Sequence, residues 1–170
     1  VDRNTIHSIE FRDAEESSLL VREEETWKIA IGGSLYPADT KKVDEFLEKL
    51  LELKTRRFVT DNENRYPDFE LSPERRSIVL FTEEGEPFEE ILVGKGENSQ
   101  MEYVKASGSK KVFAVENIFG FYINQDGPYW SDLQVFPDEL KEKEIVKIDI
   151  FADNIAVNNE SGPLSADFSL

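Results

Sequence analysis

One segment constrains the fold of this chain more than any other. Residues 27–54 combine alternating apolar positions, a Gly-Gly pair and a helical pattern. Alternation at period two is typical of a strand with one buried face, and the Gly-Gly pair predicts its end. A helix is predicted from Pro37 to Lys54, with Asp39 near its positive N-terminal end. Spacings of three and four predict an apolar stripe formed by Val43, Phe46, Leu47, Leu50, Leu51 and Leu53. We expect this stripe to pack on a sheet and not to form a partner groove.

Short strand patterns make up most of the remaining chain. Strands are predicted near residues 6–11, 19–21, 27–31, 78–81, 88–93, 103–104 and 112–115. Closely connected strands pair antiparallel. We therefore predict an α+β fold, an antiparallel meander-rich sheet with one main amphipathic helix packed on a face. Gly94-Lys95-Gly96 lacks the remainder of a phosphate-binding loop and is predicted to be a turn.

The domain organisation has one open question. Residues 1–143 are predicted to form a single α+β domain, and residues 144–170 a terminal hairpin. The apolar spacing of the first hairpin recurs in the last, with Ile6, Ile9 and Phe11 matching Ile145, Ile148 and Ile150. Either a second, truncated repeat starts near Glu144, or two ordinary hairpins coincide.

Composition excludes several functions. The chain has 20 basic and 36 acidic residues among 170, a formal charge of −16. Such a surface repels phosphate backbones and anionic lipids, so we expect neither nucleic-acid nor headgroup binding. The absence of cysteine excludes disulfides and thiolate chemistry. No apolar run is long enough to insert into a membrane. The chain starts at Val1, so we expect that an N-terminal segment has been removed.

Residues with catalytic or ligating chemistry form no convincing pattern. His7 is the single histidine and is expected to be structural or exposed. Adjacent carboxylates such as Glu89 and Glu90 do not indicate a catalytic site, because 36 acidic residues produce such pairs by chance. The stretch 61–64 resembles the start of a calcium loop, but Arg65 stands where an oxygen ligand belongs. We predict no enzymatic activity, no cofactor and no metal.

An aromatic, glycine-punctuated stretch supplies the candidates for an interaction surface. Tyr122, Tyr129 and Trp130 belong to residue types that are enriched at binding hot spots. The alternative is that these aromatic side chains cap an open end of the sheet.

Several short motifs carry a family resemblance. They are Trp27, Tyr36-Pro37-Ala38-Asp39, Val43-Asp44, Phe58-Val59-x-Asp61, Leu92-Val93-Gly94-Lys95 and Trp130-x-Asp132, in this order. Over most of residues 5–150 the chain resembles the bacterial domain of unknown function 4340 family. The resemblance implies a membrane-tethered, extracytoplasmic protein associated with an ABC-type transporter, and it implies no catalytic residues.

These observations lead to two functional hypotheses. The first is a non-enzymatic extracytoplasmic interaction domain, periplasmic or at the cell surface, with a protein partner in the cell envelope. It would be accessory to a cell-envelope or ABC-transporter system and tethered through the missing N-terminal segment. The alternative is a small-ligand or polysaccharide-binding module that uses the aromatic surface at Tyr122, Tyr129 and Trp130.

Overall fold

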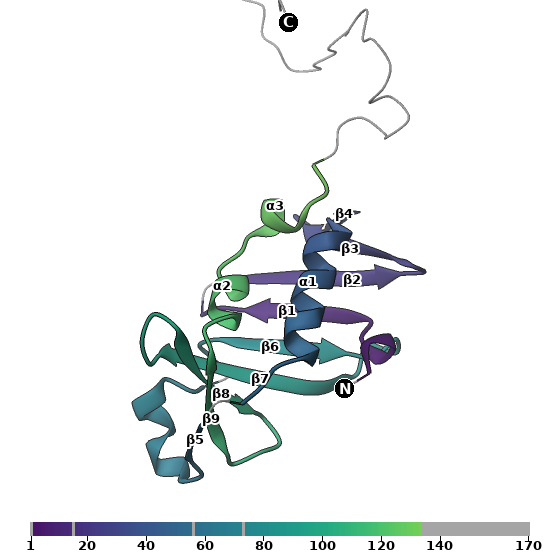
Figure 1. Cartoon of the computed structure of the whole chain (residues 1–170). Coiled ribbons are helices and arrows are strands. Elements are labelled where there is room, and N and C mark those ends of the chain that lie inside the picture. Colours follow the sequence, from purple (N-terminus) through teal and green to yellow (C-terminus); the bar gives the residue numbers. More distant parts are fainter. Residues whose placement is uncertain (1, 15, 56, 73, 134–170) are drawn as a thin grey trace, which may run out of the picture. The chain divides into compact units, whose positions relative to one another are not determined.

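The computed structural model describes residues 2–14, 16–55, 57–72 and 74–133, and the hairpin predicted at 144–170 lies outside them. The described residues build a nine-stranded sheet in the order β4-β3-β2-β1-β6-β7-β8-β9-β5 (Figure 1). Its strands are β1 (Ser8–Arg12), β2 (Ser17–Glu23), β3 (Thr26–Ile31), β4 (Ser34–Pro37), β5 (Arg57–Thr60), β6 (Ser77–Phe81), β7 (Pro87–Gly96), β8 (Met101–Ala106) and β9 (Val112–Glu116). The helical elements are η1 (Arg3–Thr5), α1 (Thr40–Leu51), η2 (Glu63–Phe69), α2 (Phe119–Ile123) and α3 (Gly127–Trp130).

The predicted α+β meander sheet is confirmed. All eight strand pairings are antiparallel, and two meanders, β1–β4 and β6–β9, meet where β1 pairs with β6. Alternate residues of a strand point to opposite faces. In β1 the apolar residues Ile9 and Phe11 are buried on one face, while Ser8, Glu10 and Arg12 point to the other.

The main helix is shorter than predicted at both ends. Asp39 is its N-cap and accepts hydrogen bonds from the backbone N–H groups of Lys41, at 3.0 Å, and Lys42, at 3.4 Å. The placement of Pro37 in this helix was wrong, because Pro37 ends the edge strand β4. Gly32 and Gly33 have φ of 57° and 82°, the pattern of a two-residue hairpin turn that returns the chain from β3 into β4.

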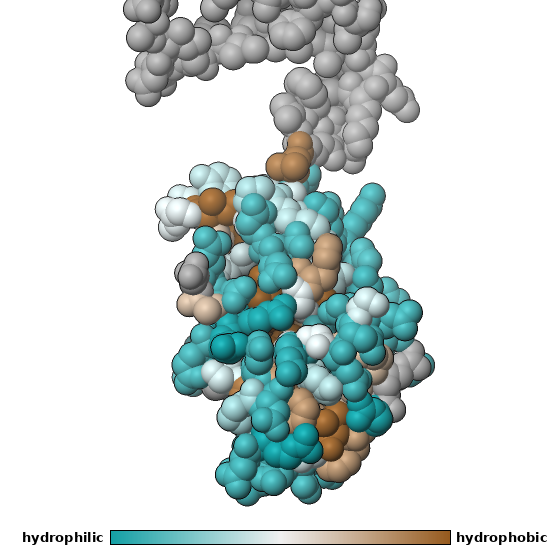
Figure 2. Space-filling view, turned by 90° about the vertical axis from the view of Figure 1, so that its left-hand side faces the viewer, coloured by the Kyte–Doolittle hydropathy of each residue, from teal (hydrophilic) through white to brown (hydrophobic). Residues whose placement is uncertain are grey.

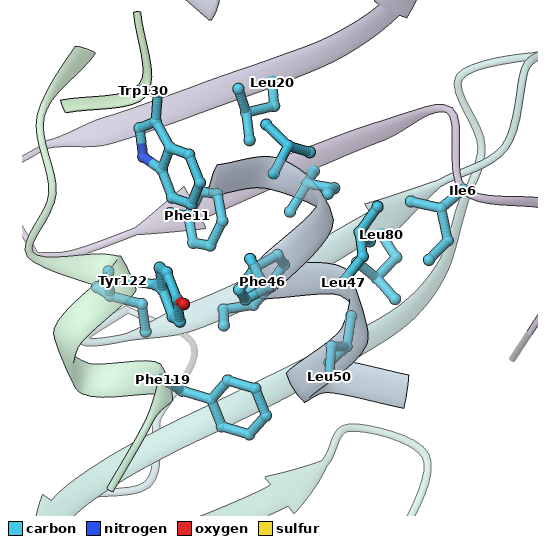
Figure 3. Close-up of a cluster of buried hydrophobic side chains, with 14 of the residues drawn as sticks. Ile6, Phe11, Leu20, Phe46, Leu47, Leu50, Leu80, Phe119, Tyr122 and Trp130 are labelled. Atoms are coloured by element: carbon cyan, nitrogen blue, oxygen red, sulfur yellow. The ribbon is translucent and has the colours of Figure 1, made fainter. Parts of the chain in front are cut away.

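The main core lies between the sheet and the three α-helices. Figure 1 shows α1 running across the strands, with α2 and α3 on the same side, which we call the helix face. Four stripe residues of α1 are buried, namely Val43, Phe46, Leu47 and Leu50, as the helical spacing predicts. They pack with Ile9, Phe11, Ile78 and Leu80 from the two central strands (Figure 3).

A second, smaller core lies on the opposite face of the sheet. It consists of Phe69, Leu71, Leu92 and Val112, with Tyr66 and Tyr103 partly buried against it. The segment that contains η2 covers this face over β7–β9. Gly94 lies in β7, which corrects the predicted turn, and a Cβ added there would lie 2.2 Å from the carbonyl oxygen of Phe69. Glycine at this position therefore allows the η2 segment to approach the strand.

The N-cap of α1 provides a test of this local structure. We expect Asp39→Ala to lower the free energy of unfolding by about 1 kcal/mol, because two backbone N–H groups lose their acceptor. Asp39→Asn keeps a side-chain acceptor and should cost clearly less. Urea unfolding followed by circular dichroism measures both, and equal losses would contradict the capping role.

Candidate functional site

An apolar groove opens on the helix face beside the C-terminal end of α1. It has a volume of about 310 Å³ and extends over strands β6–β9. Its apolar lining includes Leu50, Leu51, Leu53, Leu80, Ile91 and Phe113. This volume lies at the lower end of the range for small-ligand sites, so the groove suits one or two side chains or a small apolar group.

The groove exists because α1 ends before it has crossed the whole sheet. After Leu51 the chain runs to β5, the edge strand, and leaves the helix face of the later strands partly open. Leu51 is 38% exposed, so the expectation that the whole stripe belongs to the core was wrong at this end of the helix. On β5, Phe58 is 51% exposed and packs edge-to-face on Phe113, with the two ring centroids 6.0 Å apart.

Few charged groups border this apolar lining. Three charged residues belong to the lining, namely Glu89, Lys105 and Lys111, and Glu89 and Lys111 lie at its margin. Glu89 and Glu90 are neighbours on β7 and therefore point to opposite faces. Glu90 instead lies 3.7 Å from the guanidinium of Arg12 on the other side of the sheet. Elsewhere, on the side that Figure 2 presents, hydrophilic residues dominate and apolar residues appear in small groups.

The aromatic residues predicted to form a surface lie mainly in the core. Trp130 is fully buried and Tyr122 is 2% exposed, whereas Tyr129 is half-buried. The Trp130 ring stacks on Phe11 with the ring centroids 5.0 Å apart, and it also stacks with Tyr122, whose ring centroid is 5.7 Å away (Figure 3). These residues thus follow the capping alternative, and two of the three cannot contact a sugar or ligand in this conformation.

The exposed aromatic group of this region was not among the candidates. Phe121 is 52% exposed and lies 5.8 Å, centroid to centroid, from Tyr129. Lys42 Nζ donates a hydrogen bond of 2.6 Å to the Tyr129 carbonyl and lies 4.7 Å from the centre of its ring. Burial raises the pKa of Tyr129, with a further contribution from Tyr122. This arrangement holds the short helix α3 against α1.

One buried carboxylate was missed by the sequence reasoning. Glu102 on β8 is 1% exposed, and it is the one buried acidic side chain among the residues that the structure describes. Its two oxygens accept hydrogen bonds from the backbone N–H groups of Ile118, Phe119 and Gly120, at 2.9, 2.6 and 3.0 Å. Glu102 therefore ties the start of α2 to the sheet. Its position in a strand 16 residues earlier gives no local signal for this contact.

Metal-binding clusters and membrane-spanning helices are both absent from the described residues. In the described part of the chain, no three histidine or acidic side chains are grouped to hold a metal ion. Within the same residues, every helix is too short or too polar to cross a bilayer. His7 Nε2 lies 3.7 Å from the Glu83 carboxylate, at the periphery of the sheet.

The burial of Trp130 predicts a large effect on stability. Trp130→Ala should lower the free energy of unfolding by about 3–5 kcal/mol, since it empties a packed aromatic site. Phe121→Ala, at a 52% exposed ring, is the matched control and should cost less than about 1 kcal/mol. Urea unfolding measures both, and similar losses would refute the assignment of Trp130 to the core.

The raised pKa of Tyr129 predicts an alkaline effect. The tyrosine ionises near pH 10 in the unfolded chain and at higher pH when folded, so its contribution to stability declines as pH rises above about 10. Tyr129→Phe removes this decline. Its stability relative to the parent protein should therefore be higher at pH 11 than at pH 8, as measured by urea unfolding. An identical difference at the two pH values would contradict the shift.

Comparison with known proteins places the chain in a family without assigning an activity. No curated protein and no solved structure shows a significant match to it. A family model described as a domain of unknown function (DUF4340) matches residues 27–167. The matched region starts at β3 and includes α1, the groove and Trp130, which agrees with the motifs that carry the sequence resemblance. Since the match covers most of its length, the chain belongs to the DUF4340 family.

Proposed function

We propose that the chain is a non-enzymatic interaction domain that binds an apolar segment of a protein partner in the groove beside α1. The observation that carries this proposal is an open apolar surface in a protein of charge −16. Leu51 and Phe58 are exposed, and Ile91 and Phe113 in the groove lining are only partly buried by the described residues. A mostly apolar groove of this size is the usual starting point for a binding-site hypothesis.

The cellular setting is part of the same proposal. We place the domain outside the cytoplasm, tethered to the membrane and accessory to an ABC-type transporter or another cell-envelope assembly. Its support is the implied setting of the family that the chain resembles. The strongly negative charge disfavours nucleic acid as the partner.

A matched pair of variants tests the proposal. The parent protein, Leu51→Glu and Leu35→Glu are immobilised and incubated with detergent-solubilised membranes of the source organism. Leu51 is 38% exposed in the groove, and Leu35 is 42% exposed on β4, at the far edge of the sheet. Both substitutions add one negative charge at a similarly exposed leucine, so they differ mainly in location.

We expect a transporter or envelope subunit to be retained by the parent and by Leu35→Glu. Its recovery on Leu51→Glu, measured by quantitative mass spectrometry, should fall at least about tenfold, which corresponds to the loss of one good apolar contact. If no envelope protein distinguishes Leu51→Glu from Leu35→Glu, the proposal is wrong.

A further inference from the structure

The sheet consists of two halves with the same topology. Strands β1–β4 form one meander followed by α1, and strands β6–β9 form a second followed by α2. The two meanders join through the antiparallel pair β1·β6, where Glu10 lies opposite Val79. A pseudo-two-fold axis normal to the sheet at this pair exchanges the halves, and β5 is an addition at one edge.

The strand registers give the equivalent positions. Phe11 lies opposite Ile78 and Ile9 opposite Leu80, so the axis exchanges Phe11 with Leu80. The registers of the outer pairs, β1·β2 and β2·β3 in one half and β6·β7 and β7·β8 in the other, extend this correspondence. The equivalent positions on the helix face are Phe11 and Leu80, Ser18 and Glu89, Leu20 and Ile91, and Ile29 and Ala106.

In the first half, a short aromatic turn covers these positions. Trp130 of α3 stacks on Phe11, with an angle of 20° between the rings and with Leu20 beside them (Figure 3). Ser18 Oγ donates a hydrogen bond of 3.1 Å to the carbonyl of Gln125. The turn also contacts β3, the strand that contains Ile29.

In the second half, the equivalent positions line the open groove. Leu80, Glu89, Ile91 and Ala106 all belong to its lining. Leu80 stands where the first half has Phe11 and Ala106 where it has Ile29, so these two positions hold smaller side chains in the second half. Leu80 is buried beside α1, whereas Ala106 is partly exposed in the groove, and Glu89, larger than its counterpart Ser18, lies at the margin. The groove is therefore the unfilled counterpart of the Trp130 site.

We infer that the groove binds a short turn of a partner protein that inserts an aromatic side chain, as α3 does in the other half. This rests on the proposed function of the groove as a docking site. Exposed Lys111 lies at the margin together with Glu89, so the partner turn can carry an acidic residue beside Lys111, as Asp126 and Asp132 flank Trp130 in the first half. A second copy of this chain cannot supply its own turn in the native state, because Trp130 is buried in its own core.

The turn of this chain provides the probe. A fluorescein-labelled peptide of residues 125–132, Gln-Asp-Gly-Pro-Tyr-Trp-Ser-Asp, is titrated with the intact protein and followed by fluorescence anisotropy. We expect saturable binding below about 1 mM, weakened at least about tenfold when the peptide carries Trp130→Ala. Ala106→Phe in the protein fills the groove and should weaken binding by a similar factor, while Leu35→Glu should leave it unchanged.

The peptide experiment needs a folding control for the groove variant and a comparison with a small apolar ligand. Thermal unfolding checks that Ala106→Phe is folded, and Leu51→Glu at the exposed margin replaces it if it is not. Absence of saturable binding, or equal binding of the peptide with Trp130→Ala, would overturn the inference. Binding of free indole as tight as that of the peptide would also overturn it, in favour of a small apolar ligand. Peptide binding without an envelope partner would support the inference and refute only the proposed function. Recovery of an envelope partner that depends on Leu51, without binding of the peptide, would support the proposed function and refute only the inference.

Discussion

The pairing of β1 with β6 holds the two halves of this protein together. It joins residues about 70 positions apart in the chain, and its helix-face side chains, Ile9, Phe11, Ile78 and Leu80, are all buried. Because α1 packs on these side chains, the helix can be placed only when both central strands are present. The pair thus connects two meanders of local pairings into one core, and such non-local pairing carries a larger loop-closure entropy and slows folding.

Local features of the fold could be predicted from the sequence, and non-local ones could not. Alternation of apolar residues predicts β1–β3 and β6–β9, and spacings of three and four predict α1, because these patterns reflect burial of one face of each element. Strand β4 was missed because all four of its residues are exposed and Pro37 is equally suited to a helix start. The Gly-Gly pair was a usable signal, since two-residue turns of this kind predict a hairpin. The order of strands in the sheet depends on β1·β6, for which no local pattern exists.

The candidate site depends even more than the fold on non-local packing, which local sequence patterns do not predict. Residue type drew attention to Tyr122, Tyr129 and Trp130, but aromatic residues fill cores as readily as they form interfaces, and burial decides between the two. The groove combines side chains from α1 and from four strands, so it appears only after these elements have packed. Even Leu51, part of a helical stripe that was expected to be buried, is exposed because the helix ends short of the later strands.

The close approach at Gly94 has a consequence for comparing relatives of this protein. A side chain at the equivalent position would collide with the backbone that carries Phe69 and displace the η2 segment from the opposite face of the sheet. Any family member with a larger residue there must therefore cover that face differently or leave it open. This single position can sort members of the family into those that share both cores and those that retain only the core beneath α1.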